Sequence, residues 1–223
     1  MSKKIGIVLS GCGVNDGSEI HESVMLLHSI VKHGGTPIFM APNIEQASVI
    51  DHKHVREVQE HRNVLVESAR IARGNILDIY DVHGSDLDAI VFPGGFGAAK
   101  NLSDMRMHEN VENMVVELHT QQLIEEMFEA GKPMGFTCIS PASVCAVALK
   151  GKGIKLTIGH DSKTAKNITA LGNTHIEAGA TDIVIDEDKK IVSTPAYMVT
   201  TNIVEMAEGV DKLVKQIFTF LDK

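Results

Sequence analysis

Short apolar runs alternate with longer helix-like segments along this chain, and that alternation constrains the fold more than any other feature. Ile5–Leu9, Thr36–Ala41 and Leu87–Phe92 are each short and mostly apolar, as expected of strands buried on both faces of a sheet. A helical pattern with a predicted cap at Ser18 follows the first run and ends near His33, before two glycines. This order predicts an α/β sandwich with a mostly parallel sheet.

The second half of the chain continues the alternation. We expect a helix within about 113–130, a strand at Met134–Thr137 and a helix at Ile139–Leu149. A hairpin of Ile183–Ile185 and Ile191–Thr194 should follow. The last expected helix carries Val210, Leu213, Ile217 and Leu221. Residues 43–80 lack a regular pattern and are typical of an exposed, solvated insertion. The histidines in that segment do not have the spacing of metal ligands, so no metal site is expected. We therefore expect a single domain over 1–223 with an insertion around 43–80.

Composition narrows the classes of partner. The net charge of −8 argues against a nucleic-acid surface or an anionic membrane as partner, and 4% aromatic residues leave little for base stacking. No apolar run approaches the roughly 18 residues that span a bilayer. Three cysteines are sparse and odd in number, which predicts free thiols in a reducing compartment, and the start of the chain resembles a strand rather than a signal peptide. These observations together predict a cytoplasmic protein.

The sharpest chemical signal is the segment Gly135–Ala142, in which a strand ends at Cys138 and a helix begins immediately afterwards. This is the local plan of a nucleophile elbow, which exposes a nucleophile at the carboxyl end of a strand. A helix N-terminus stabilises a thiolate and can bind an anion. The alternative is a small buried cysteine without chemistry. Cys145 is expected in the core, and Cys12, in a glycine-rich loop, is a minor candidate for the same edge.

The first predicted helix is apolar on more than one side. Glu22 lies about 200° around it from Ile20, and its neighbours one turn on are Met25 and Leu26. A buried carboxyl there would have a raised pKa and could serve as an acid or base; the alternative is a surface glutamate with its stem along apolar neighbours. One stripe has the spacing of a face that packs on a core; it is formed by Ile20, Val24, Leu27 and Val31.

Two further patterns complete the candidate site. Pro93-Gly94-Gly95 follows a predicted strand, and glycines there let a backbone N–H reach a site without a Cβ in the way. The alternative is an ordinary turn. His160 and His175 both follow Cys138 in sequence and are candidate base partners or assisting residues; the alternative is that both are bystanders.

Taken together these pieces resemble the ThiJ/PfpI superfamily, whose fold is related to class I glutamine amidotransferases. Within it the chain is similar to the ElbB family, the isoprenoid biosynthesis proteins with an amidotransferase-like domain. The segments that carry this narrower resemblance are Ser10–Gly13, Asp16–Glu22, Arg62–Ile71, Pro93–Leu102 and Thr194–Met198. They span nearly the whole chain.

The resemblance implies a flavodoxin-like three-layer sandwich. It also implies that Cys138 is the elbow cysteine, that Glu22 hydrogen-bonds it, and that the N–H groups of Gly95 and Ile139 form the oxyanion site. The pattern His175-Ile176-Glu177 comes before the final hairpin rather than after it, and Ile139 follows the cysteine where some relatives have histidine. Neither glutaminase nor protease activity is therefore expected. Because members of the superfamily are commonly dimeric, a homodimer is a candidate assembly.

The resemblance further implies a glutathione-independent glyoxalase, a lyase without cofactor that converts a small aldehyde, glyoxal, to glycolate through a cysteine hemithioacetal, with a protein deglycase activity also claimed for the family. The alternative is a redox-sensing or regulatory module with little catalysis. For the pair itself we predict a Cys138 thiolate with a pKa well below that of free cysteine, beside a neutral Glu22.

Overall fold

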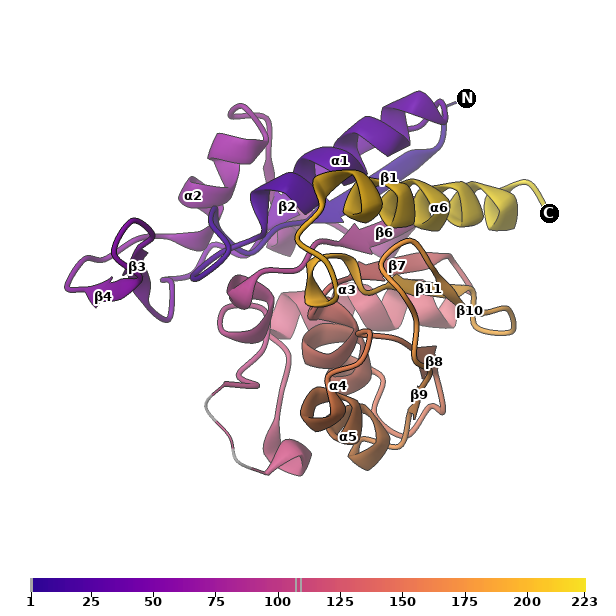
Figure 1. Cartoon of the computed structure of the whole chain (residues 1–223). Coiled ribbons are helices and arrows are strands. Elements are labelled where there is room, and N and C mark those ends of the chain that lie inside the picture. Colours follow the sequence, from indigo (N-terminus) through magenta and orange to yellow (C-terminus); the bar gives the residue numbers. More distant parts are fainter. Residues whose placement is uncertain (1, 107, 109) are drawn as a thin grey trace.

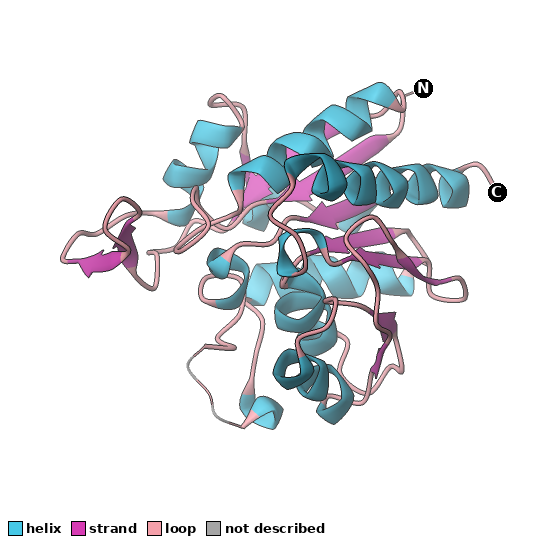
Figure 2. Ribbon diagram, viewed as in Figure 1, coloured by secondary structure: helices cyan, strands magenta, loops and turns pink. Residues whose placement is uncertain are grey.

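The computed structural model describes residues 2–106, 108 and 110–223. Within them, seven strands form one sheet in the order β10-β11-β7-β6-β1-β2-β5, in which only the β10–β11 pair is antiparallel (Figures 1 and 2). The strands of this sheet are β1 (Lys4–Val8), β2 (Thr36–Ala41), β5 (Leu77–Asp78), β6 (Ala89–Phe92), β7 (Met134–Thr137), β10 (Val184–Asp186) and β11 (Ile191–Thr194). The predicted α/β, flavodoxin-like sandwich with a mostly parallel sheet is confirmed.

Helices cover both faces of the sheet. Helices α1 (Ile20–Lys32) and α6 (Ile203–Leu221) lie side by side on one face, and α3 (Leu118–Glu129) lies on the other with α4 (Ala146–Ala148) and α5 (Ser162–Ala170) (Figure 1). A π-helix at Pro141–Cys145 leads directly into α4. The predicted helix over Ile139–Leu149 is therefore present, with wider turns in its first half.

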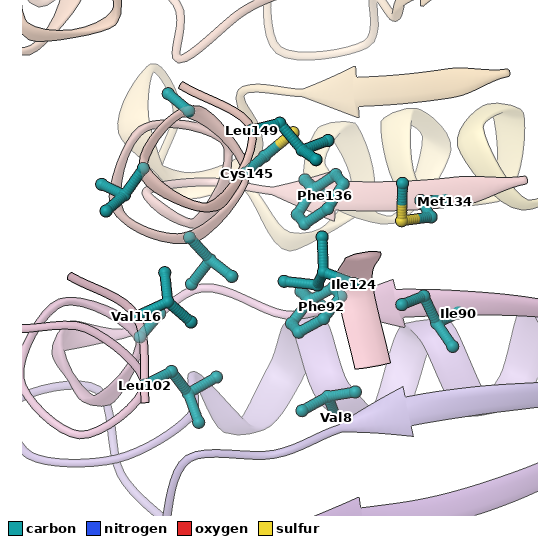
Figure 3. Packing of buried hydrophobic residues seen from close by; sticks show 14 of the residues in the cluster. Val8, Ile90, Phe92, Leu102, Val116, Ile124, Met134, Phe136, Cys145 and Leu149 are labelled. Atoms are coloured by element: carbon teal, nitrogen blue, oxygen red, sulfur yellow. The ribbon is translucent and has the colours of Figure 1, made fainter. Parts of the chain in front are cut away.

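Alternating side chains along each strand feed two separate cores. Ile90 and Phe92 of β6 point into the core shared with α3 and the π-helix, whereas Ala89 and Val91 point into the core shared with α1 and α6. In the first core the Phe92 and Phe136 rings stack with centroids 4.9 Å apart (Figure 3). Burial on both faces explains why these strands are continuous apolar runs rather than alternating ones.

Helix α1 differs from its prediction in two ways. Its cap is Glu19, whose Oε2 accepts the N–H of Glu22 at 2.7 Å, and not Ser18, whose hydroxyl instead accepts the N–H of Ser10. Of the predicted stripe, Ile20, Val24 and Val31 are exposed, and Leu27 alone is partly buried and packs against the core. The buried face carries Glu22, Ser23, Leu26, Ser29 and Ile30. The buried polar side chains of this face have hydrogen-bond partners: Glu22 accepts from Thr137 and Gly94, and Ser23 donates to the carbonyl of Glu19.

Residues 43–80 contain a small antiparallel sheet of β3 (Val49–Asp51) and β4 (Arg56–Val58), which projects from the body, and the helix α2 (Val64–Ile71) (Figure 1). The buried carboxylate of Asp16 holds the small sheet in place by accepting the N–H of Ile50 at 2.7 Å. The division into a single domain stays a prediction.

A second two-stranded sheet, of β8 (Lys155–Leu156) and β9 (Thr174–His175), flanks α5. Among the described residues, no helix is both long enough and apolar enough to cross a bilayer.

Candidate active site

The topology brings the loop after β6 and the turn after β7 together at one edge of the sheet. The chain runs outward from β1 through β2 to β5, then returns to place β6 on the other side of β1, so that the strand order reverses between β1 and β6. In open parallel sheets, ligands bind outside the carboxyl ends of the strands at such a point. The loop after β6 begins with Pro93-Gly94-Gly95, and β7 ends one residue before Cys138.

Cys138 occupies a strained turn between β7 and the π-helix. Its φ is +59°, a left-handed conformation that a residue with a Cβ rarely adopts, and its N–H donates to the carbonyl of Thr194 on β11 at 3.0 Å. The Ser140 hydroxyl braces the turn, accepting the N–H of Thr137 at 3.0 Å and lying 3.0 Å from the carbonyl oxygen of Phe92. This is the strand-turn-helix geometry that the elbow interpretation requires.

Glu22 is fully buried. Of the two alternatives, a buried carboxyl or a surface glutamate, the structure therefore supports the first. Its Oε2 accepts the Thr137 hydroxyl at 2.7 Å and the N–H of Gly94 at 2.8 Å. Its Oε1 has no hydrogen-bond partner among the described oxygen and nitrogen atoms. An unpartnered buried oxygen is costly, and here it belongs to a group that couples to the Cys138 thiol.

Gly94 is the point at which the cysteine and the glutamate meet. A Cβ built on Gly94 would overlap the Cβ of Cys138 and would lie 2.9 Å from its Sγ and 3.0 Å from Glu22 Oε2. Any side chain at this position would therefore push the two groups apart. The glycine is needed here for space, because its own backbone conformation is one that other residues adopt.

Burial dominates the protonation of both groups. Burial raises the pKa of Glu22 to about 7, against the lowering effect of its hydrogen bonds from Thr137 and Gly94. Burial likewise raises the pKa of the Cys138 thiol well above its usual value, and the Glu22 carboxylate raises it further. The N–H groups of Gly95 and Ile139 act in the opposite direction by hydrogen bonding to the sulfur.

The raised pKa of Glu22 agrees with the prediction, but the low pKa predicted for Cys138 is wrong. The prediction weighed the backbone donors and the helix start above the burial of the sulfur, and the structure reverses that order. At neutral pH the pair is therefore a thiol beside a carboxyl that is partly ionised. A carboxyl that is partly ionised at this pH can accept a proton from a neighbouring thiol, and this role of Glu22 stays a prediction.

A cavity of about 810 Å³ opens onto Cys138. Gly95 and Ile139 lie in its wall beside the cysteine, so the structure brings Cys138, Glu22, Gly95 and Ile139 to one place. Their chemical roles stay predictions. The cavity wall also includes Phe96, Met105, Arg106, His108, Met114, Lys163 and Tyr197.

Neither predicted histidine lines this cavity. His175 lies in β9, where its Nε2 is 3.4 Å from the N–H of Ile158, and burial lowers its pKa. His160 lies near enough to His175 to influence that pKa. Assistance by either residue therefore stays a prediction without a direct contact to support it.

A different histidine approaches the site. His21, next to Glu22 on α1, has its Nδ1 2.9 Å from the hydroxyl of Tyr197, which lines the cavity. His21 and Glu22 both belong to the segment Asp16–Glu22 that carries the family resemblance. The contact of His21 with Tyr197, however, spans 176 positions in sequence. No local pattern indicates such a long-range contact, so the sequence could not single out this histidine or this tyrosine.

Comparison with known proteins places the chain among its relatives. No protein-family model matches it. It is 37% identical to the rat (Rattus norvegicus) ES1 protein homolog, mitochondrial, over 99% of this chain and 85% of that protein. It is 36% identical to the human (Homo sapiens) glutamine amidotransferase-like class 1 domain-containing protein 3, mitochondrial, over 99% of this chain and 84% of that protein.

These relatives correct the predicted location. Both are named as mitochondrial proteins, which contradicts the cytoplasmic location inferred from the sparse cysteines. The inference went wrong because free thiols indicate only a reducing environment, and a cysteine count does not say which compartment provides it.

Solved structures show the same relationship. An isoprenoid biosynthesis protein with amidotransferase-like domain from Ehrlichia chaffeensis superposes with a TM-score of 0.91 and 35% identity, over 99% of this chain and 100% of that one. Drosophila melanogaster DJ-1beta, at 15% identity and a TM-score of 0.54 over 99% and 98% of the two chains, shares the fold. The chain therefore belongs to the family of ES1 proteins and isoprenoid biosynthesis proteins with an amidotransferase-like domain.

Proposed function

We propose that the protein is a glutathione-independent glyoxalase that converts glyoxal to glycolate with Cys138 as nucleophile. The observation that supports this most directly is the pairing of a strained elbow cysteine with a buried carboxyl whose pKa is about 7. Isomerising a 2-oxoaldehyde requires a nucleophile and a group that both accepts and returns protons near neutral pH. Glu22 fits the second requirement because its Oε1 has no other partner among the described oxygen and nitrogen atoms.

The first half of the reaction forms the hemithioacetal. The sulfur of Cys138 attacks one aldehyde carbon of glyoxal, a C–S bond forms, and the thiol proton passes to the Glu22 carboxylate. The N–H groups of Gly95 and Ile139, which hydrogen-bond the sulfur at rest, stabilise the oxyanion that develops beside it. Glu22 then returns the proton to that oxygen and is a carboxylate again.

The second half moves a hydrogen between the two carbons. Glu22 removes the proton from the carbon bonded to sulfur, giving an ene-diolate. Glu22 delivers that proton to the other carbon, and the hydroxyl proton moves from the oxygen of the first carbon to the oxygen of the second, giving a thioester of glycolic acid. Water then cleaves the C–S bond and releases glycolate and the thiol. One carbon is oxidised while the other is reduced, so the sequence needs no external oxidant or reductant. Proton transfer by a placed side chain contributes about 10²–10⁴-fold in rate.

The test is glycolate formation from glyoxal by the wild type and three variants. Cys138→Ala and Glu22→Gln should each lose the activity, whereas Cys145→Ala should keep it, because Cys145 does not line the cavity. Circular dichroism establishes that each variant folds. Glycolate formation by Cys138→Ala at the wild-type rate would refute the proposal.

The alternative, an oxidant-sensing module, is less well supported. Oxidation by peroxide needs a thiolate, and burial together with the Glu22 carboxylate raises the pKa of Cys138. Mass spectrometry after mild peroxide treatment separates the two functions. Selective oxidation of Cys138 at low peroxide, together with negligible glyoxal turnover, would favour the sensor.

A further inference from the structure

The cavity at Cys138 is far larger than glyoxal. Its volume of about 810 Å³ falls within the roughly 300–1,000 Å³ of pockets that enclose drug-sized ligands, whereas glyoxal has four non-hydrogen atoms. Three methionines, Met105, Met114 and Met198, contribute to the wall. Methionine side chains are flexible and adapt to irregular apolar shapes. The cavity therefore has room for an apolar segment attached to the reactive carbonyl group.

Two cations lie in the same wall. Arg106 and Lys163 are exposed side chains from different segments, and within the described part of the chain neither has a carboxylate oxygen within 4.0 Å of its charged nitrogens. Arg106 is supported by the ring of Phe96, over which its guanidinium lies 4.3 Å from the centroid. Thr164 and Asn167, on the same helix as Lys163, also line the cavity and can donate hydrogen bonds.

The acidic side chains of the wall are already engaged. Glu19 accepts the N–H of Glu22 at 2.7 Å at the start of α1, and Asp161 accepts the N–H of Thr164 at 2.7 Å at the start of α5. A carboxylate at a helix N-terminus is offset by the positive end of the helix dipole. His108, which also lines the cavity, has its Nε2 2.8 Å from Oδ2 of Asp104. Asp161 lies near enough to Lys163 for the charge of that lysine to lower the Asp161 pKa, although no Asp161 oxygen comes within 4.0 Å of the Lys163 ammonium. Among the described residues of the wall, Arg106 and Lys163 are the permanently charged cations that can face a ligand.

We propose that the preferred substrate is an anionic 2-oxoaldehyde in which an apolar segment separates the aldehyde from a terminal carboxylate. The aldehyde meets Cys138, the apolar segment lies along the methionines, and the carboxylate binds Arg106 and Lys163. This inference rests on the proposed function for the identity of the reactive group. The anion subsite itself can be tested without turnover.

The test compares two alkylating probes with the same reactive end. One is 6-(iodoacetamido)hexanoate, and the other is its uncharged methyl ester. In both cases the sulfur of Cys138 displaces iodide, a C–S bond replaces the C–I bond, and the thiol proton is lost to base. Peptide mass spectrometry assigns the label to Cys138, and the rate with iodoacetamide normalises for the reactivity of the thiol in each variant.

In the wild type at low ionic strength, the carboxylate probe should label Cys138 about fivefold faster than the ester, as expected for partly exposed charge pairs. The advantage should shrink at high salt. The double variant Arg106→Met/Lys163→Met should lose it. Lys166→Met is the matched control, since Lys166 lies on α5 three residues from Lys163 and does not line the cavity; this variant should keep the advantage.

Equal labelling by the two probes in the wild type would overturn the anion subsite, and so would an advantage that survives in the double variant. Glyoxal turnover by the wild type is measured alongside. If turnover is absent but the carboxylate probe is favoured, the proposed glyoxalase function is wrong and the anion subsite stands. If turnover is present but the probes react equally, the substrate class is wrong and the proposed function stands.

Discussion

Cys138 and Cys145 are seven residues apart and both buried, yet they lie in different chemical surroundings. Cys145 is completely enclosed, within the π-helix and among the side chains of the core (Figure 3). Cys138 is 9% exposed, lines the cavity, and receives the N–H groups of Gly95 and Ile139. Burial raises the pKa of both thiols. The difference is therefore in the neighbours: Cys138 is hydrogen-bonded to the Glu22 carboxyl and to the N–H groups of Gly95 and Ile139, whereas the Asp186 carboxylate acts on Cys145 through its charge alone.

The comparison also shows where the strain lies. Cys138 has a φ of +59°, whereas Cys145 has helical backbone angles with φ −61° and ψ −52°. Residues in sparsely populated conformations cost about 1–3 kcal/mol each and persist only where the surroundings hold them. The N–H of Cys138 donates to the carbonyl of Thr194, and the neighbouring Thr137 N–H donates to the Ser140 hydroxyl, so that the turn is held on both sides of the cysteine. The energetic cost is thus concentrated at the cysteine that faces the cavity.

The largest effect is expected from Gly94→Ala, which should remove the feature that distinguishes Cys138 from Cys145, its contact with Glu22. The new methyl group overlaps the Cβ of Cys138 and lies against Glu22, so the pair separates and glyoxal turnover should fall by about 10²-fold or more. Gly135→Ala is the control: its Cβ would lie 2.7 Å from Leu213 Cδ2 and 3.1 Å from Val91 Cγ1, in the core rather than at the site. It should lose stability but keep turnover. Full activity in a folded Gly94→Ala variant would contradict the arrangement described.

A second prediction concerns stability and pH. The pKa of Glu22 is about 7 in the folded state and 4.5 as its ordinary value, so between these values the folded protein binds more protons than the unfolded chain. The free energy of unfolding should therefore fall as the pH rises from 4.5 to above 7, by about 3 kcal/mol from this group. Urea unfolding at pH 4.5 and pH 8 should show that Glu22→Gln lacks this fall. The same fall in wild type and variant would exclude Glu22 as its source.

Much of the sheet could be predicted from the sequence, because strands buried on both faces are continuous apolar runs. Thr36–Ala41 and Met134–Thr137 agree with β2 and β7 residue for residue. The elbow was visible for a similar reason: a strand, a cysteine and a helix are adjacent in sequence. The orientation of α1 could not be predicted in this way, since its exposed side is as apolar as a stripe that faces a core.

The remainder of the site depends on contacts between distant segments. Glu22 could be buried or exposed on sequence grounds, and the bonds from Gly94 and Thr137 that settle it span 72 and 115 positions. Arg106 and Lys163 come from separate segments and gain significance only because both reach the cavity. His160 and His175 are candidates because they follow the cysteine in sequence, but the order of residues in sequence does not determine which of them lie near Cys138.

A third prediction uses pH to sharpen the distinction between the two cysteines. If Glu22 accepts the proton of Cys138, then kcat/KM for glyoxal should fall about tenfold for each pH unit below about 7, as the carboxylate is protonated. Glu22→Gln should remove this inflection along with most of the rate. The rate at which iodoacetamide labels Cys138 should show the same inflection in the wild type. A labelling rate that rises only above pH 8.5, with no inflection near 7, would show that the two groups act independently.

The smallest effect is expected at Cys145, and it separates packing from chemistry. Cys145→Ala leaves a small void in an apolar core and should lower the free energy of unfolding by about 1 kcal/mol, with glyoxal turnover unchanged. Cys145→Ser nearly preserves the volume but buries a hydroxyl. Because the residue is helical, that hydroxyl can bond a carbonyl in the preceding turn, so the cost should stay within about 1–2 kcal/mol. Urea unfolding measures both variants beside the glyoxal assay. A loss of turnover in Cys145→Ala larger than its loss of stability explains would place Cys145 in the reaction and remove the contrast with Cys138.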